Sequence, residues 1–315
     1  MHMANVDVSV IIPCKNSRSK TAGIIKKFSQ ENDGLTLEFI IIDMNSNDGT
    51  VLESLSLIKE LGLLGYVIQS GSGTVPAALN TGIFRSSGKY VTFVYPTRLY
   101  KDYLQSYFAE AEKREADFVF AAPKSDPPQK NIVPVGMTGT DLAVSLIHSS
   151  VVMDFAAVLY RREFLTGNGI RFYEDCTNGY AEAFIFSSLM YLPVVANADI
   201  DIERDYLGSS IVDESKMVSK NCFERLDAMI HVYETARMRF KDDKVLLSLL
   251  RYQKLPSVAL GCVDKLLSEG FGSSAIKKQM SVKGYDKYID YSADTPYDLK
   301  MKIITWKLLP FAYKP

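Results

Sequence analysis

Two apolar runs, each followed by a polar turn, stand out in the first fifty positions of the chain. They are Val-Ser-Val-Ile-Ile at 8–12 and Phe-Ile-Ile-Ile at 39–42. The run at 40–42 shows no alternation of apolar and polar residues, which predicts a strand covered on both faces, as in a parallel sheet. Ligands bind at the carboxyl ends of such strands. We therefore expect a polar ligand at the turns 13–17 and 43–50.

Segments with helical periodicity alternate with these strands. Helices are predicted over 17–31, 51–63 and 76–87, and further strands near 66–68, 90–95 and 117–121. Apolar residues at helical spacing should form the buried stripes of the first two helices: Ala22, Ile24, Ile25 and Phe28 in the first, and Leu52, Leu55, Ile58 and Leu61 in the second. This alternation predicts a right-handed α/β fold built on a mostly parallel sheet.

A polar, proline-rich stretch at 124–134 interrupts the first part of the chain and predicts a loop, either a lid over a ligand or a plain surface connection.

The pattern of apolar and polar residues changes after Gly208. Segments 215–240, 243–253 and 256–280 then read as helices, the first with Leu226, Met229, Ile230 and Tyr233 on one face. We expect two domains: residues 1–212 form the α/β domain and residues 213–315 a helical module.

The segment 299–309 combines four-residue apolar spacing with Lys300, Lys302 and Lys307. Two interpretations are open. Such a helix can lie on an anionic membrane with its lysines outward, which would make the protein peripheral at the inner face of the membrane. The alternative, which we favour, is that Trp306 and the leucines pack on the preceding helices.

Composition sets limits on partners and location. The 315 residues are 47% hydrophobic and 23% charged, which is ordinary globular composition. A net charge of −1 gives no basic excess for nucleic acid. The four cysteines are far apart without metal-site spacing, which is typical of free thiols in a reducing compartment. No secretory signal and no membrane-length apolar run is present, so we expect a cytoplasmic protein.

Four blocks in order resemble the family-2 inverting glycosyltransferases of the GT-A fold. They are Ile11-Ile12-Pro13-Cys14-Lys15-Asn16, the turn from Asp43 to Thr50, the stretch from Pro76 to Phe93, and the stretch from Tyr160 to Phe172. Met44, Asn45 and Leu79 depart from the usual residues. The resemblance covers roughly 7–212. It implies a Rossmann-like sheet that binds a nucleotide-diphosphate sugar and a glycan or glycoconjugate acceptor.

The resemblance also implies a set of nucleotide-binding residues. They lie at strand ends, in the third helix and after the fourth strand: Pro13, Lys15, Asn16, Asp43, Ser46, Asn80, Tyr95 and Thr97. Asp43 would accept from the base edge. Asp48, before Gly49, is more typical of a helix cap.

The usual Asp-x-Asp metal motif is absent after Val94. The chain has Tyr95-Pro96-Thr97-Arg98 there, so no metal site and no cofactor are expected, and Arg98 would stabilise the departing diphosphate instead. The expected Glu-Asp signature is reduced to Glu182, whose apolar neighbours should raise its pKa and suit a general base. Glu174 and Asp175 are alternatives.

Two functions from different classes follow. The first is a metal-independent transferase that inverts the anomeric centre of its donor, of the type that builds bacterial surface polysaccharides. The second is a catalytically inactive homologue that binds a nucleotide or glycan and supports a partner glycosyltransferase, which the lost carboxylates favour.

Overall fold

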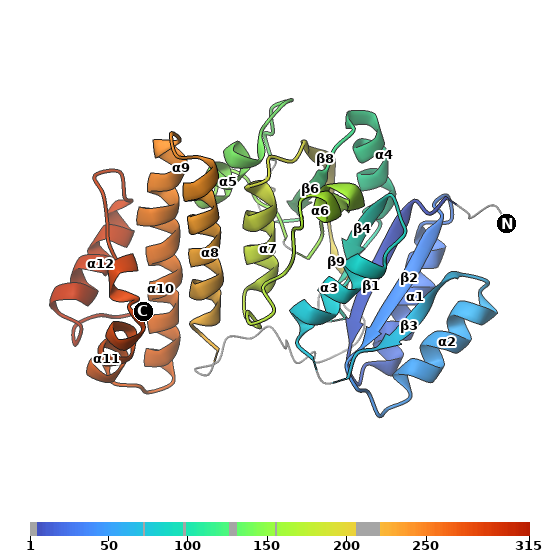
Figure 1. The fold of residues 1–315 in the computed structure, drawn as a ribbon, viewed down its shortest axis with the longest axis horizontal. Coiled ribbons are helices and arrows are strands. Elements are labelled where there is room, and N and C mark those ends of the chain that lie inside the picture. Colours follow the sequence, from blue (N-terminus) through green and yellow to red (C-terminus); the bar gives the residue numbers. More distant parts are fainter. Residues whose placement is uncertain (1–4, 72, 97–98, 126–130, 155, 206–220) are drawn as a thin grey trace.

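A single seven-stranded sheet organises the first two thirds of the chain in the computed structural model (Figure 1). The structure describes residues 5–71, 73–96, 99–125, 131–154, 156–205 and 221–315. The strand order is β3-β2-β1-β4-β7-β6-β8. Their bounds are β1 Val8–Cys14, β2 Leu37–Asp43, β3 Leu64–Gln69, β4 Tyr90–Phe93, β6 Phe118–Pro123, β7 Leu159–Arg161 and β8 Val195–Ile202.

The sheet is mostly parallel, as the sequence predicts. β1 pairs in parallel with β2 and β4, and β2 with β3. The exception is β7, which is antiparallel to both β4 and β6. Every residue of β1 and β2 is buried, which confirms that strands without alternation are covered on both faces. A two-stranded sheet pairs β5, Leu99–Tyr100, with β9, Arg204–Asp205.

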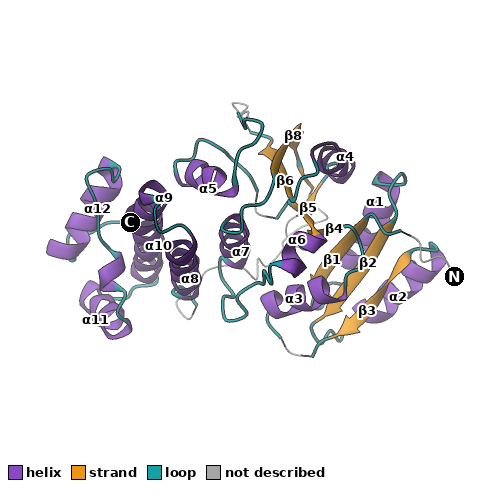
Figure 2. Cartoon of the chain, turned by 45° about the horizontal axis from the view of Figure 1, so that its top comes forward, coloured by secondary structure: helices purple, strands orange, loops and turns teal. Residues whose placement is uncertain are grey.

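Seven helices of the described chain accompany these strands. They are α1 Arg18–Glu31, α2 Thr50–Glu60, α3 Val75–Arg85, α4 Leu104–Arg114, α5 Gly139–Ile147, α6 Arg162–Gly167 and α7 Tyr180–Leu189. The views of Figures 1 and 2 both place α6 beside α3. The predicted buried stripe of α1 is confirmed, since Ala22, Ile24, Ile25 and Phe28 are all in the core.

The predicted stripe of α2 is wrong at three of its four positions and confirmed only at Ile58. Leu52 is 74% exposed, and Leu55 and Leu61 are also exposed, whereas Leu57 and Ile58 are buried. The helix turns the face of Thr50, Ser54, Leu57 and Ile58 to the protein because it packs on α1 and on β3, the last strand of the sheet. An outer helix buries a narrower stripe than its leucine content suggests.

The C-terminal part is helical. It contains α8 Glu224–Arg239, α9 Lys244–Leu249, a π-helical turn at Leu250–Lys254, α10 Leu255–Ser268, α11 Ser273–Lys283, a 3-10 turn at Asp286–Tyr288 and α12 Tyr297–Leu308. The continuous helix predicted over 256–280 is interrupted, because Gly270 adopts a φ of +88°. The predicted domain boundary at 212–213 lies outside the described residues, as does the centre of the predicted lid, 126–130.

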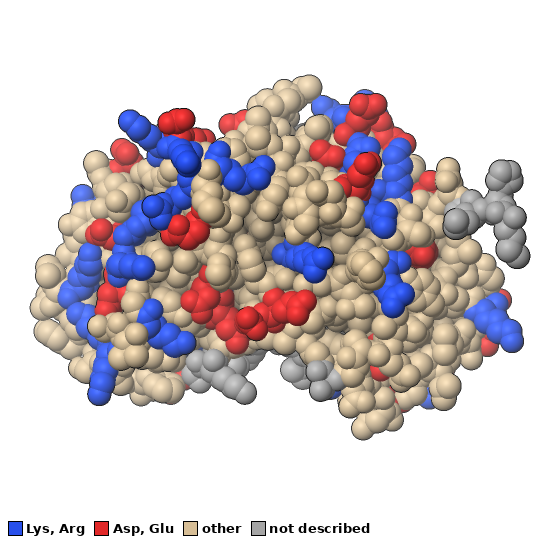
Figure 3. All heavy atoms as spheres, viewed as in Figure 1, with Lys and Arg blue, Asp and Glu red and all other residues tan. Residues whose placement is uncertain are grey.

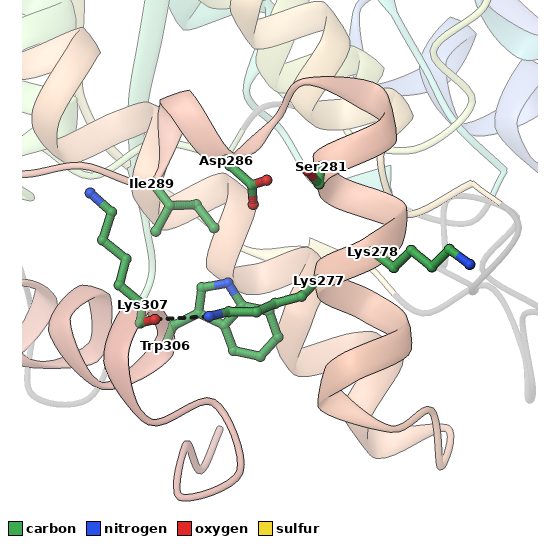
Figure 4. A pocket seen from close by; sticks show the side chains of 7 residues that line it. All are labelled: Lys277, Lys278, Ser281, Asp286, Ile289, Trp306 and Lys307. Atoms are coloured by element: carbon green, nitrogen blue, oxygen red, sulfur yellow. Dashed lines mark hydrogen bonds between the residues drawn. The ribbon is translucent and has the colours of Figure 1, made fainter.

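Trp306 packs on the preceding helices, as we expected. It is 1% exposed, and α12 contacts α10. The prediction that the leucines pack there as well is wrong for Leu308 and Leu309, which are exposed because they lie at the end of α12. The Lys277 ammonium lies over the indole ring of Trp306 and donates to the carbonyl oxygen of Lys307 at 2.8 Å, beside a cavity of about 400 Å³ (Figure 4). The side chains of Lys278 and Lys307 extend away from the ring. No helix in the described ranges is long and apolar enough to cross a bilayer.

Candidate functional site

The polar turns after β1 and β2 are joined by hydrogen bonds. The Asn16 backbone N–H donates to Ser46 Oγ at 2.8 Å, and the Asn47 N–H donates back to Asn16 Oδ1 at 2.9 Å. At the next residue, the Ser17 N–H donates to Thr50 Oγ1. The parallel pairing of β1 with β2 places Cys14 opposite Asp43, so the two turns begin side by side. The structure thus brings Asn16, Asp43 and Ser46 together at one edge of the sheet.

Asp48 completes this connection. Its carboxylate accepts from the backbone N–H of Arg18 at 3.0 Å and from the N–H and hydroxyl of Thr50. The slight burial of Asp48 acts to raise its pKa, but the hydrogen bonds from Thr50 and Arg18 outweigh burial and lower the pKa. Asp48 therefore serves the first turns of α1 and α2, as expected of a capping residue.

Asp43 lies beneath the second turn and is fully buried. Its Oδ2 accepts from the Ser46 N–H at 3.1 Å, and its Oδ1 faces the Cys14 thiol at 3.9 Å. Burial, with the charge of Asp43 next in importance, raises the pKa of Cys14 to about 12. The thiol stays protonated and can donate to the carboxylate. Contact between Asp43 and a base stays a prediction, because the carboxylate itself is occupied with holding the turn.

Groups other than Asp43 form the exposed side of the turns. Lys15 and Asn16 are exposed, while Pro13 is buried in the strand. Asn16 has a φ of +47° and Asn45 a φ of +65°, the left-handed conformation that asparagine tolerates better than most residues. Since Asn16 uses its side-chain oxygen in the turn, its amide NH₂ is the group left to face solvent.

An aromatic cluster closes the end of β4. The rings of Phe172 and Phe184 stack at 3.8 Å between centroids, and both meet Phe93 edge to face. Tyr95, in the position of the missing metal motif, is buried and lies 6.0 Å from the ring of Tyr180. Thr97 and Arg98 lie outside the described residues. The sequence analysis missed Tyr180, although its spacing of four from Phe184 places both side chains on one face of α7.

The prediction of a raised pKa for Glu182 is wrong. The Glu182 carboxylate accepts from Lys254 Nζ at 2.6 Å and from Arg225 Nε at 2.7 Å. Burial acts to raise its pKa as we expected, but the two cations outweigh burial and lower the pKa of Glu182 to about 2. A carboxylate with this pKa and these partners is a poor proton acceptor.

Helical geometry explains the direction of Glu182. Two residues along an α-helix turn the side chain by about 200°, so Glu182 faces opposite to Tyr180. The Tyr180 face meets the aromatic cluster, and the Glu182 face meets α8 and the π-helical turn. The apolar neighbours in sequence do not surround the carboxylate, because partners more than forty residues later in the chain occupy its side of the helix.

Asn80 holds the segment before α7. Its Oδ1 accepts from the Phe172 N–H at 2.8 Å, and its Nδ2 donates to the Phe172 carbonyl and to Glu174 Oε1, both at 3.0 Å. Thr74 adds a hydrogen bond from its hydroxyl to the Glu174 carbonyl oxygen. Asn80, expected to bind the nucleotide, thus has its side-chain amide occupied by this segment.

Glu174 and Asp175, in the segment before α7 that Asn80 holds, carry exposed carboxylates. Figure 3 shows acidic side chains gathered on this face over the loop that leads into α7. Among the residues that the structure describes, no three His, Cys, Asp or Glu side chains come together in a group suited to a metal ion.

Residues 9–132 match the sequence model of the family described as glycosyl transferase family 2. No curated protein matches the chain in sequence. Among solved structures, the chain is similar to residues 1–349 of TarS from Staphylococcus aureus in complex with UDP-GlcNAc, with a TM-score of 0.66 and 13% identity over 96% of this chain and 87% of that one. It is also similar to the mannosyltransferase PcManGT from Pyrobaculum calidifontis in complex with GDP-Man and Mn²⁺, with a TM-score of 0.55 and 15% identity over 99% and 89% of the two chains. At these identities the likeness concerns the fold.

Proposed function

We propose that this protein transfers a sugar from a nucleoside diphosphate sugar to a hydroxyl group of a glycan or glycoconjugate, with inversion, since residues 9–132 match the sequence model of glycosyl transferase family 2. The observation that carries the proposal is the pair of interlocked turns after β1 and β2. They form a rigid polar edge at the carboxyl ends of adjacent parallel strands, where ligands of open α/β sheets bind.

The nucleotide would lie over these turns. Lys15 and the amide of Asn16 face solvent there, and Asp43 fixes the shape of the second turn from below. We infer that the base contacts Asn16 and the edge of the Asp43 turn, with Ser46 between them. The fold relatives support this arrangement, since TarS binds UDP-GlcNAc and PcManGT binds GDP-Man.

The diphosphate would be stabilised without a metal ion. Tyr95, Pro96 and Thr97 offer no carboxylate, and a guanidinium such as that of Arg98 can compensate the charge of a leaving diphosphate bidentately. PcManGT, in contrast, is described in complex with Mn²⁺. The test is nucleotide binding and donor hydrolysis with and without EDTA. We expect no change, and a strict requirement for manganese or magnesium would contradict metal independence.

The base for the acceptor hydroxyl would come from the loop before α7. Glu182 is committed to Lys254 and Arg225, whereas Glu174 and Asp175 are exposed at the same end of the helix. We therefore place the base at Glu174, held by Asn80, with Asp175 as its alternative. Glu174→Gln should slow transfer by about 10²–10⁴-fold at unchanged nucleotide affinity, and Asp175→Asn, measured in parallel, distinguishes the two carboxylates.

A second function has its own support. The loss of carboxylates after Val94 and the ion-paired state of Glu182 both fit a catalytically inactive subunit that assists another glycosyltransferase. If the purified protein hydrolyses none of the nucleotide sugars it binds, but raises the activity of a glycosyltransferase that co-purifies with it, this second function is correct.

The cellular setting is part of the proposal. We place the protein in the cytoplasm, at the inner face of the membrane, in the synthesis of a bacterial surface polysaccharide. Leu308 and Phe311 are 73% and 80% exposed beside the lysines of 299–309, which supports peripheral contact with an anionic bilayer. Sedimentation with vesicles containing phosphatidylglycerol, compared with phosphatidylcholine alone, tests this contact.

Calorimetry with uridine, guanosine and thymidine diphosphates tests the central claim. We expect one of them to bind, and Asp43→Asn to weaken that binding, because a neutral amide accepts more weakly than a carboxylate from the Ser46 N–H and so holds the second turn less firmly. Binding of none of the three nucleotides would contradict the proposed function.

A further inference from the structure

A hollow of about 460 Å³ lies on the outer side of α3, where that helix meets α6 and the segment 169–174. We call it the α3–α6 hollow. The side chains that matter for its chemistry are Thr81, Phe84, Arg85, Thr166, Arg171 and Glu174. Its size is within the range of small-molecule sites, and it is separate from the turns that would hold the nucleotide.

The hollow leads away from the ligand-binding edge of the sheet. α3 begins after β3 and ends before β4, so its first residue lies near the carboxyl ends of the strands and Arg85 lies at the opposite edge. Eleven helical residues span about 16 Å. Glu174 is tied to Thr74 and Asn80 at the near end by hydrogen bonds. A linear polymer whose reacting end lies near Glu174 can therefore extend along the hollow toward Arg85.

Phe84 offers an exposed ring at the far end, and the guanidinium of Arg85 lies over this ring, 5.9 Å from its centroid. Phe84 is 75% exposed although it sits in the hollow's lining. The face of an aromatic ring packs well against the C–H groups of a pyranose, and it loses little conformational entropy when it does so. Thr81 and Thr166 donate their hydroxyls to helix carbonyls, so their oxygens keep the capacity to accept from sugar hydroxyls.

Two guanidinium groups and the carboxylate of Glu174 line the hollow, so its charged side chains are positive in sum. Arg85 and Arg171 are exposed, and within the described ranges no carboxylate lies at salt-bridge distance from either. Other arginines of this part are occupied: Arg161 pairs with Asp117, and Arg162 donates to Ser86. Exposed guanidiniums beside an aromatic ring suit a ligand that carries phosphate or carboxylate groups, which they bind bidentately.

We propose that the α3–α6 hollow is a subsite for an acidic glycan, with Arg85 and Arg171 binding its phosphate or carboxylate groups and Phe84 stacking on a sugar ring. The proposal rests on the proposed function in one respect: the glycan is then the acceptor, and the hollow holds units distant from the reacting hydroxyl. The binding itself requires only the groups described above.

Binding of defined polymers tests the subsite without any transfer reaction. Affinity electrophoresis or calorimetry would compare an oligogalacturonate, a poly(glycerol phosphate) and a neutral dextran of similar length. We expect at least one acidic polymer to bind at least tenfold more tightly than dextran, and the two acidic probes distinguish carboxylate from phosphate recognition. The double variant Arg85→Gln/Arg171→Gln should lose at least tenfold in this affinity, and Phe84→Ser should weaken it as well.

The controls separate this proposal from the proposed function. Arg237→Gln removes one charge from α8, away from the hollow, and should bind the acidic polymer as wild type does. Nucleotide diphosphate binding, measured on the same double variant, should be unchanged. Equal binding of dextran and the acidic polymers, or unaltered binding by the double variant, would overturn the subsite. If wild type binds the acidic polymer but no nucleoside diphosphate, the transferase function is overturned and the subsite is not.

Discussion

The ammonium of Lys254 donates to the carboxylate of Glu182 across 2.6 Å, joining the π-helical turn at 250–254 to the first turn of α7. Arg225 of α8 donates to the other oxygen at 2.7 Å. Glu182 is 5% exposed. This three-residue cluster connects the helical C-terminal part to the sheet-bearing part through one charged carboxylate.

Acid should destabilise the protein through Glu182. Its folded pKa of about 2 is below its ordinary value of 4.5, so the stabilisation is complete above pH 4.5 and is lost as the pH falls toward 2. A shift of this size corresponds to about 3 kcal/mol. Urea unfolding of wild type and Glu182→Gln between pH 7 and pH 3 measures it.

Glu182→Gln should lower the free energy of unfolding at pH 7 by about 2–3 kcal/mol, because it leaves Lys254 and Arg225 without their partner at a largely buried position. The variant should also lose part of the acid dependence seen in wild type. Glu60→Gln, an exposed position on α2, is the matched control. An equal pH profile for wild type and Glu182→Gln would contradict the assigned cluster.

Gly82 should not accept a side chain. A Cβ there would lie 2.3 Å from Cγ2 of Ile11, so Gly82→Ala should destabilise the protein by about 1–3 kcal/mol through overpacking of α3 against β1. Gly261→Ala, at a helical glycine with nothing within 4 Å, should stabilise it by about 0.5–1 kcal/mol. Thermal unfolding compares the two. Ile11→Ala should relieve part of the Gly82→Ala defect, and additive effects in the double variant would argue against this contact.

Removing the Asn80 amide should loosen the segment before α7. Asn80→Ala leaves the N–H and carbonyl of Phe172 without their side-chain partners, which costs about 1–3 kcal/mol. Hydrogen exchange should rise at 171–175 and stay unchanged in β1. Thr81→Ala, the next position on α3, is the control. Faster exchange across the whole sheet would mean that Asn80 stabilises the fold rather than this segment.

The cysteines should be unreactive in the native state. All four are at most 2% exposed, and burial raises the pKa of Cys14 and of Cys176 to about 12. Iodoacetamide at pH 8 should therefore label none of them in the folded protein and all four in urea, as read by intact mass. Rapid labelling of the native protein would contradict the burial of these thiols.

Much of the α/β part could be predicted from local patterns. Val10–Ile12 and Ile40–Ile42 are apolar on both faces, which only a strand covered by helices on both sides accommodates. The polar turns after them were predicted to lie at one edge of the sheet, and the structure places them side by side there. The direction of β7 could not be predicted, because a three-residue strand carries no pattern that encodes parallel or antiparallel pairing.

The sequence by itself determined the first strands and helices and which strand ends carry polar groups, because these depend on periodicity within short windows. Only the tertiary structure decided what each polar side chain does. Glu182 pairs with Lys254, which lies 72 positions later in the chain, and Asn80 holds Phe172, which lies 92 positions later. The pKa of a carboxylate and the hydrogen-bond partners of an amide depend on the groups that packing brings close to them. Contacts between residues so far apart in the chain cannot be predicted from the local pattern of apolar and polar residues.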